Sequence, residues 1–149
     1  MTGVWALLGA VAVVAVIAVV LRARDGRVRV AEPGGSPAAE PGEHLPAAVR
    51  DLLDRHTPVT LVQLSTTFCA NCRQTRTVLE DLAARTEGLR HVELDVTDLP
   101  GVAADLGVLR APTTVALDPA GAELLRVGGV PKPDRLIAAL RPHLPGPIG

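Results

Sequence analysis

The longest apolar run in the chain lies at its amino terminus. Residues 3–21 contain no charged side chain, and a helix over them would be apolar on every face. Such a helix is about as long as the hydrocarbon core of a bilayer is thick. A cleaved signal peptide fits less well, because no Lys or Arg precedes the run and it exceeds the usual length of roughly 7–15 residues. We therefore predict a single transmembrane anchor over residues 3–21, with Trp5 near an interface.

The composition changes abruptly after the anchor. Arg22, Arg24, Arg27 and Arg29 follow it, and a Pro-, Gly-, Ala- and Glu-rich stretch continues from there. We predict a basic flank and flexible linker over residues 22–44. The positive-inside rule then favours the cytoplasmic face of a cell membrane for the rest of the chain, with the extracytoplasmic face as the alternative. The first two arginines are expected to lie near anionic lipid headgroups.

From residue 45 to residue 144 the apolar positions switch repeatedly between the helical and the strand period. The predicted order of elements is α-β-α-β-α-β-β-α, with Leu45, Val49, Leu52 and Leu53 on the first helix. The later elements are a strand over 59–64, a helix over 70–85, a strand over 91–96, a brief helix from Pro100, a hairpin over 113–117 and 123–127, and a last helix containing Leu136, Ile137 and Leu140. This order predicts an α/β fold, a three-layer sandwich whose mixed central sheet has helices on both faces.

Charge and composition narrow the possible functions. The formal net charge is −1, and no basic cluster lies inside the predicted domain. Nucleic acid is therefore not an expected partner. Aromatic residues are almost absent, and Phe68 is the only one after Trp5. Its place directly before Cys69 draws attention to that position.

The chain has two cysteines, Cys69 and Cys72. Two are far too few for a disulfide-stabilised scaffold, and they supply only half of the ligands of a typical structural zinc site. The four histidines are scattered along the chain, with no ligand spacing relative to the cysteines. Redox chemistry is the leading interpretation, and the sequence indicates no cofactor.

Thiol–disulfide exchange requires a thiolate nucleophile, a nearby second thiol and access for a substrate. Cys69 comes soon after the predicted strand over 59–64, and the predicted helix begins at the next residue. The amino terminus of that helix would lower the pKa of the Cys69 thiol. Cys72, one turn later on the apolar face, would be shielded from solvent. The alternative is a chance pair of cysteines without redox function.

In this setting the sequence resembles the thioredoxin family. The stretch over residues 65–73, STTFCANCR, resembles the family's active-site pattern of an aromatic residue, CxxC and a basic residue. The stretch Arg110-Ala111-Pro112-Thr113 resembles its cis-proline loop, and Val127-Gly128-Gly129 its glycine after the final strand. The order and spacing of the three stretches extend the resemblance over residues 45 to about 144, almost all of the chain beyond the linker.

The resemblance implies a thioredoxin-like fold and a role for each matching residue. Cys69 would be the attacking thiol and Cys72 the resolving thiol. Pro112 would lie beside them in a cis peptide, although an ordinary proline at the start of a strand is the alternative. The Ala111 backbone would hydrogen-bond the substrate chain. The substrate-binding patch would be bordered by Phe68 and Gly128.

The chain also departs from the family. Thioredoxins have a buried Asp on the strand before the active site, which accepts the proton of the resolving thiol, and Gln63 stands here instead. We hypothesise that Glu93, on the neighbouring strand, is the proton acceptor, with its pKa raised by burial. The alternative is that Glu93 points to solvent. Ala70-Asn71 replaces the Gly-Pro of thioredoxins between the cysteines.

Two functions follow from these expectations. The first is a thiol–disulfide oxidoreductase that exchanges disulfides with cysteine-containing protein substrates at the membrane, and that depends on an unidentified redox partner. The alternative is a module of the same fold that binds a metal such as copper or acts as a docking surface.

Overall fold

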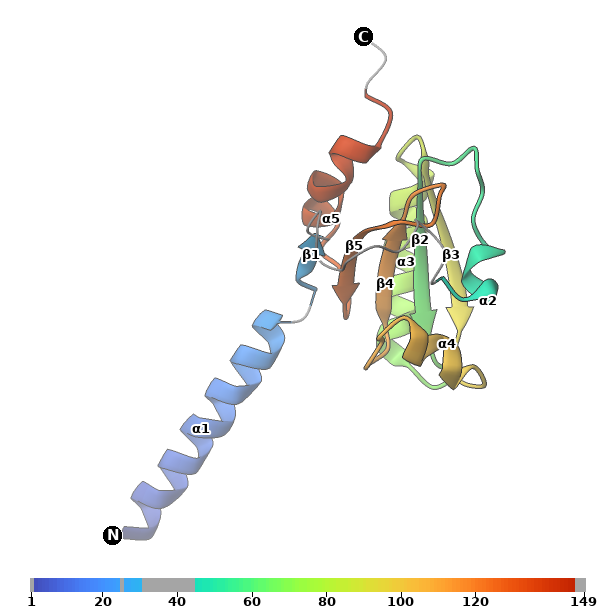
Figure 1. The fold of residues 1–149 in the computed structure, drawn as a ribbon. Coiled ribbons are helices and arrows are strands. Elements are labelled where there is room, and N and C mark those ends of the chain that lie inside the picture. The colour runs from blue at the N-terminus through green and yellow to red at the C-terminus, as the bar shows by residue number, and fades with distance from the viewer. Residues whose placement is uncertain (1, 25, 31–44, 147–149) are drawn as a thin grey trace, which may run out of the picture.

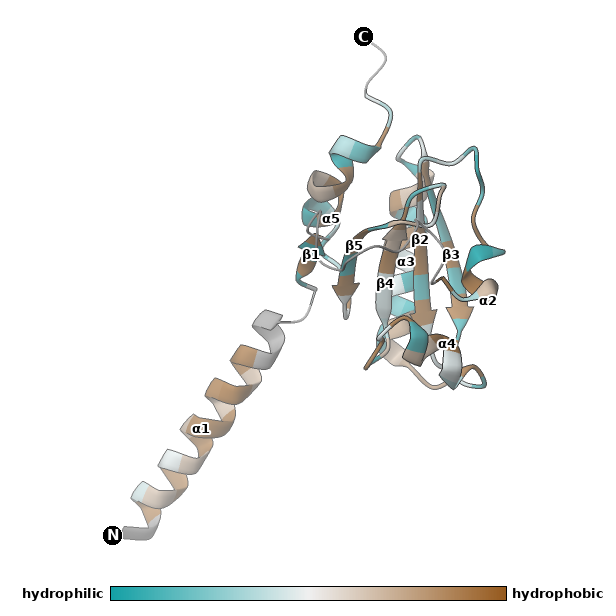
Figure 2. Ribbon diagram, viewed as in Figure 1, coloured by the Kyte–Doolittle hydropathy of each residue, from teal (hydrophilic) through white to brown (hydrophobic). Residues whose placement is uncertain are grey.

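The computed structural model describes residues 2–24, 26–30 and 45–146 (Figure 1). Helix α1, Thr2–Arg24, contains the apolar run. Its side chains from Val4 to Val20 are exposed, and Figure 2 shows that most of them are hydrophobic. Within the described part of the chain, no helix reaches the length and apolar character needed to cross a membrane. The anchor over residues 3–21 stays a prediction.

A five-stranded mixed sheet forms the centre of the fold (Figure 1). Its strands are β1 Val28–Val30, β2 Val59–Ser65, β3 Leu89–Asp95, β4 Thr113–Leu117 and β5 Glu123–Gly128. They lie in the order β1-β5-β4-β2-β3, with β2 parallel to β3 and every other pair antiparallel. Strand β2 is buried along its whole length, and its buried residues include the polar Thr60, Gln63 and Ser65.

Helices cover both faces of this sheet. Helices α3, Ala70–Ala84, and α5, Pro133–Leu140, supply core residues to one face, and α2, Ala47–Arg50, and α4, Pro100–Asp105, pack against the other. A short 3₁₀ helix, Arg141–His143, follows α5. Successive side chains of a strand point to opposite faces, so Leu61 joins the first core and Val62 the second. The predicted α/β sandwich is confirmed.

Helix α2 is shorter than the pattern of apolar residues predicted. After Arg50 the chain continues in tight turns, in which Leu52 and Leu53 donate backbone hydrogen bonds to carbonyls three residues earlier. Both side chains still pack against the second core. Their helical spacing was therefore correct for burial but not for helix length.

Strand β1 lies inside the stretch where the sequence predicted only a basic flank and linker. It pairs antiparallel with β5, and the Gly26 N–H adds a 2.8 Å hydrogen bond to the Gly128 carbonyl. Val28 packs against the first core. A three-residue strand with one arginine between two valines is too short to show a period, so the pattern could not reveal it.

The pairing of the strands brings three distant segments to one end of the sheet. Strand β2 ends four residues before Cys69, and Leu64 near this end pairs with Thr113 at the start of β4. Thr113 in turn pairs with Gly128 at the end of β5. The cysteines, the Pro112 loop and Gly128 therefore meet at the same end of the sheet.

Candidate active site

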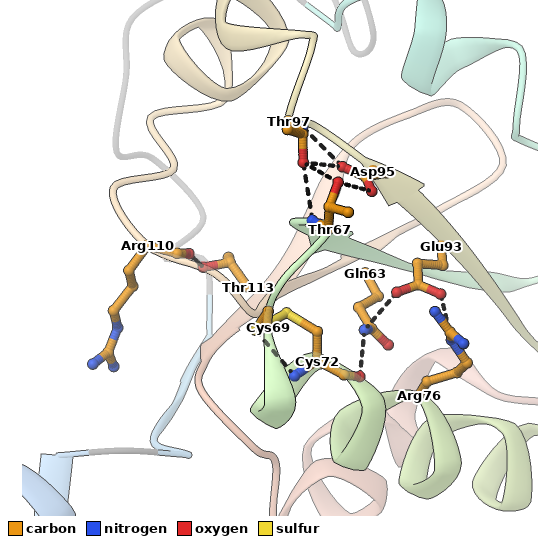
Figure 3. The surroundings of a disulfide bond; sticks show 10 residues. All are labelled: Gln63, Thr67, Cys69, Cys72, Arg76, Glu93, Asp95, Thr97, Arg110 and Thr113. Carbon is orange, nitrogen blue, oxygen red and sulfur yellow. Dashed lines mark hydrogen bonds and ion pairs between the residues drawn. A yellow bond between two sulfur atoms is a disulfide. The ribbon is translucent and has the colours of Figure 1, made fainter.

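Cys69 and Cys72 form a disulfide at the amino terminus of α3 (Figure 3). Cys69 occupies the N-cap position with an extended backbone, and its sulfur accepts a 3.1 Å hydrogen bond from the Cys72 N–H. The Cys69 side chain is partly exposed, whereas Cys72 is only 3% exposed. A second molecule can therefore reach the Cys69 sulfur more readily than the Cys72 sulfur.

The position of Cys69 also favours a negative charge on its sulfur once the disulfide is reduced. The first N–H groups of a helix lack partners within the helix and, with the helix dipole, stabilise an anion. The first turn of α3 contains no acidic residue that would oppose this effect. The arrangement is the one in which a cysteine acts as a nucleophile.

Gln63, on β2, joins the sheet to the active-site helix. Its side chain is fully buried, and its Nε2 donates hydrogen bonds to the Cys72 carbonyl at 2.9 Å and to Glu93 Oε1 at 3.2 Å. Its Oε1 lies 3.2 Å from Nε2 of His91. An amide does not take up a proton near neutral pH, so Gln63 cannot serve as the proton acceptor. Its hydrogen bond positions Cys72 instead.

The pKa of Glu93 is lowered, whereas its predicted role required a raised pKa. Burial raises the pKa of the Glu93 carboxyl. Hydrogen bonds from Arg76 and Ser65 and the charge of Arg76 lower it, and together they outweigh burial, so the pKa of Glu93 lies below its ordinary value. Arg76 projects from α3 and forms an ion pair with this carboxylate (Figure 3). The raised pKa that we expected for Glu93 is therefore wrong, and its role as a proton acceptor stays a prediction. Glu93 is neither solvent-facing nor neutral, and Gln63 links it to Cys72.

The loop before β4 has the geometry expected of the cis-proline loop. The Ala111–Pro112 peptide bond is cis, and Pro112 is buried. The Thr113 hydroxyl donates a 2.7 Å hydrogen bond to the Arg110 carbonyl, and the Gly129 N–H donates one of 2.8 Å to the Pro112 carbonyl. These bonds tie the loop to β4 and to the end of β5. The binding role of the Ala111 backbone stays a prediction.

Two large apolar side chains near this end of the sheet are almost completely exposed. Phe68 is 100% exposed directly before Cys69, and Leu109 is 98% exposed shortly before Pro112. Exposed apolar side chains next to a reactive group are typical of a contact surface. The sequence pointed to Phe68, but nothing in it separated Leu109 from the apolar residues of the preceding helix.

The structure also reveals polar contacts that the sequence did not suggest. In the loop after β2, the Thr67 N–H donates to the Thr97 hydroxyl at 3.0 Å, and the Thr97 N–H donates to Asp95 Oδ1 at 2.9 Å. Hydrogen bonds from Thr97 hold the pKa of Asp95 below its usual value. This cluster braces the chain just before Phe68 and Cys69. Its only sequence signal was a pair of polar residues at the end of a predicted strand.

No metal site emerges from the part of the chain that the structure describes. These residues include no group of three or more His, Cys, Asp or Glu side chains arranged to hold an ion. The two sulfurs are bonded to each other. No observation at this site favours the metal-binding alternative.

Comparisons with known proteins agree with this geometry. A protein-family model described as Thioredoxin matches residues 45–142. Thioredoxins from Staphylococcus aureus strains N315 and COL are 34% identical over 87 residues, which are 58% of this chain and 83% of theirs. A mutant thioredoxin from Halobacterium salinarum NRC-1 aligns with a TM-score of 0.59 at 24% identity, over 73% of this chain and 97% of that one. A thioredoxin from Nicotiana alata aligns with a TM-score of 0.56 at 24% identity, over 74% of this chain and 100% of that one.

Proposed function

This chain belongs to the thioredoxin family and is a thiol–disulfide oxidoreductase, and from that premise we propose that it exchanges disulfides with cysteine-containing proteins at a membrane surface. One observation carries the proposal. A partly exposed Cys69 and a buried Cys72 form a disulfide at the start of a helix, at the end of the sheet where the cis-Pro112 loop lies.

The proposed reaction begins with the pair reduced. The Cys69 thiolate attacks one sulfur of a substrate disulfide, that bond breaks, and the other substrate sulfur leaves as a thiolate that takes up a proton. The Cys72 thiol then loses its proton to solvent, and its thiolate attacks the Cys69 sulfur of the mixed disulfide. The bond to the substrate breaks, and the second substrate sulfur leaves as a thiolate that takes up a proton. Two electrons have moved to the substrate, and the pair is left as the disulfide seen in the structure. A redox partner must supply two electrons to begin the cycle again.

We assign substrate binding to the surface around the sulfurs. Phe68 would contact the substrate through its exposed ring, and the Ala111 backbone would hydrogen-bond an extended substrate chain. Supporting this assignment, Phe68 is fully exposed beside Cys69, and the buried Pro112 holds the loop against the ends of β4 and β5. Gly128 would border the same surface.

The activity is tested by reduction of insulin disulfides in the presence of dithiothreitol. The full chain, in a non-ionic detergent, is expected to accelerate precipitation of the insulin B chain well beyond the rate with dithiothreitol alone. Cys69→Ser should reduce that rate to the level of dithiothreitol alone, because the nucleophile is lost. Equal acceleration by Cys69→Ser and the unaltered chain would contradict the proposal.

The membrane location is proposed from the sequence of residues 3–21 and from the exposure of the apolar side chains of α1. Apolar side chains on all faces of an exposed helix need an apolar environment. The chain should therefore stay in the membrane pellet after extraction with alkaline carbonate. A reporter fused to the carboxyl terminus should be active on the cytoplasmic side, as the flanking arginines predict. Release into the supernatant would contradict the membrane location, and activity only outside would contradict the orientation.

A further inference from the structure

Two buried hydroxyl groups have no hydrogen-bond partner among the residues that the structure describes. They are Oγ1 of Thr75, on α3, and Oγ1 of Thr114, on β4. Both residues are 0% exposed. A buried polar group without a partner destabilises a fold, so a pair of them near an active site requires an explanation.

Thr75 lies next to Cys72 on the buried face of α3. Side chains three residues apart on a helix are neighbours, with about 5–6 Å between their Cβ atoms. A threonine within a helix often donates its hydroxyl to the carbonyl four residues earlier, and Thr77, on the exposed side of α3, does so to the Arg73 carbonyl at 3.2 Å. The Thr75 hydroxyl makes no such bond. It is therefore a donor without an acceptor one helical turn from the Cys72 sulfur.

Thr114 approaches the same place from the sheet. It pairs directly with Gln63 in the antiparallel register of β4 and β2, so the two side chains point to the same face. That face is the one covered by α3, because the Gln63 amide donates to the Cys72 carbonyl at 2.9 Å. Ala116, two residues further along β4, joins the first core together with Leu79 of α3. The Thr114 hydroxyl therefore lies between the sheet and α3, beside the residue that holds Cys72.

The disulfide explains why these hydroxyls have no acceptor in this state of the protein. The Cys72 sulfur is bonded to Cys69, and a sulfur without a charge is a weak hydrogen-bond acceptor. When the disulfide opens and Cys72 ionises, its sulfur becomes an anion at a residue that is only 3% exposed. A buried anion requires hydrogen-bond donors.

We propose that Thr75 and Thr114 donate hydrogen bonds to the Cys72 sulfur once the disulfide is open, and so stabilise the thiolate that resolves the mixed disulfide. The inference rests on the proposed function and adds two residues to its second step. The Cys72 thiol gives its proton to solvent, and the thiolate accepts the two O–H groups. It then attacks the Cys69 sulfur, and the substrate sulfur leaves as a thiolate. The hydroxyls lose their acceptor again as the disulfide closes, so they favour the reduced pair over the oxidised pair.

The first test is the equilibrium of the full chain, in a non-ionic detergent, with mixtures of reduced and oxidised glutathione. Thr75→Val and Thr114→Val keep the shape of the side chain and remove the hydroxyl. Each should lower the equilibrium constant for reduction of the disulfide at least about threefold, because the reduced pair loses a hydrogen bond that the oxidised pair does not make. Thr75→Ser and Thr114→Ser keep the hydroxyl and should keep the constant of the unaltered chain.

Urea denaturation of the oxidised chains separates this effect from damage to the fold. The valine variants should unfold at the same urea concentration as the unaltered chain or at a higher one, because each removes a buried hydroxyl that has no partner in the oxidised state. A general loss of stability would instead lower the midpoint of the oxidised chain.

The second test measures the ionisation of Cys72 in the Cys69→Ser chain, in which it is the only thiol. Thiolate absorbance at 240 nm is followed as the pH rises. Adding Thr75→Val or Thr114→Val should raise the pKa of Cys72 by about half a pH unit or more, because a donor to the charged form is lost. Adding Thr77→Val is the matched control and should leave this pKa unchanged.

The charged and titratable groups linked to Cys72 through Gln63 are the same in all of these chains. They are Glu93 and His91 of β3, which hydrogen-bond to Gln63, and Arg76 of α3, which pairs with Glu93. A shift that appears only in the Thr75 and Thr114 variants therefore comes from the hydroxyls.

The outcomes separate the inference from the proposed function. If Thr75→Val and Thr114→Val keep both the equilibrium constant and the pKa of Cys72, the inference is wrong and the proposed function stands. If Thr77→Val shifts the pKa of Cys72 as much as they do, the effect is not local and the inference is overturned. If the unaltered chain exchanges disulfides with neither glutathione nor insulin, the proposed function itself is wrong.

Discussion

At the scale of single residues, the two sulfurs differ in what surrounds them. Cys69 caps a helix and is partly exposed, whereas Cys72 is buried and its carbonyl is held by Gln63. Gln63 occupies the position where the family has a proton-accepting Asp, and the carboxylate next to it, Glu93, is paired with Arg76. The Gln63 amide therefore fixes the position of Cys72, and unlike an Asp at that position it has no carboxylate to accept a proton.

This arrangement predicts how Glu93→Gln changes stability with pH. The folded-state pKa of Glu93 is lowered, so its carboxylate stabilises the fold above the unfolded-state pKa, close to the ordinary value of 4.5, and this contribution disappears as pH falls through the folded-state pKa. At pH 7 the substitution should lower the free energy of unfolding by about 1–2 kcal/mol, because it removes a partly buried charged partner. Urea denaturation from pH 7 to pH 3 should show the difference shrinking below pH 4.5.

Glu87→Gln is the control for this experiment, because Glu87 is exposed and changes there usually alter stability by less than about 0.5 kcal/mol. A stability difference between Glu93→Gln and the unaltered chain that grows as the pH falls below 4.5 would contradict the lowered pKa.

Glu93→Gln also tests the predicted role of Glu93 in proton transfer. Because the carboxyl group is ionised throughout the neutral range, its replacement should not move the pH dependence of disulfide reduction between pH 6 and pH 9. The measurement is the rate of insulin reduction as a function of pH for both chains. A shift of about one pH unit in the midpoint of the rate profile would support Glu93 as the proton acceptor.

At the scale of elements, the sequence predicted those with a strong and long pattern. Strands β2 and β3, the hairpin of β4 and β5, and helix α3 lie within a residue or two of their predicted bounds. Strand β1 was missed because three residues carry no measurable period. The Arg76–Glu93 pair was missed because the contact between α3 and β3 depends on how the helix packs, which one sequence does not reveal.

The contact between β2 and α3 leads to a second stability prediction. Gln63→Leu removes the donor to the Cys72 carbonyl and leaves that buried carbonyl and His91 with fewer partners. Unfolding free energy should fall by about 1–3 kcal/mol. Gln74→Leu, on the exposed face of α3, is the matched control and should change it by less than about 0.5 kcal/mol. Equal urea midpoints for Gln63→Leu and the unaltered chain would show that the amide does not hold the helix.

At the scale of the whole molecule, β1 ties the amino-terminal region into the catalytic domain. The strand pairs with β5 and packs Val28 against the first core. The segment that follows the predicted anchor is thus part of the fold.

Removal of β1 tests this connection. A chain that begins at residue 45 should unfold at a lower urea concentration than one that begins at residue 26, with a loss of about 2 kcal/mol or more from the strand's hydrogen bonds and from Val28. Both chains keep the cysteines and the second core. Identical midpoints would mean that β1 contributes nothing to the stability of the domain.

The roles of Cys69 as the attacking thiol and Cys72 as the resolving thiol are tested most directly by trapping the mixed disulfide. Full chains with Cys72→Ser or Cys69→Ser are prereduced and mixed with a disulfide-bonded peptide, and the products are identified by intact mass and peptide mapping. Cys72→Ser should form a stable adduct through Cys69, because no second thiol can resolve it, and Cys69→Ser should react far more slowly at its buried sulfur. A faster adduct at Cys72, or none in either variant, would contradict the account.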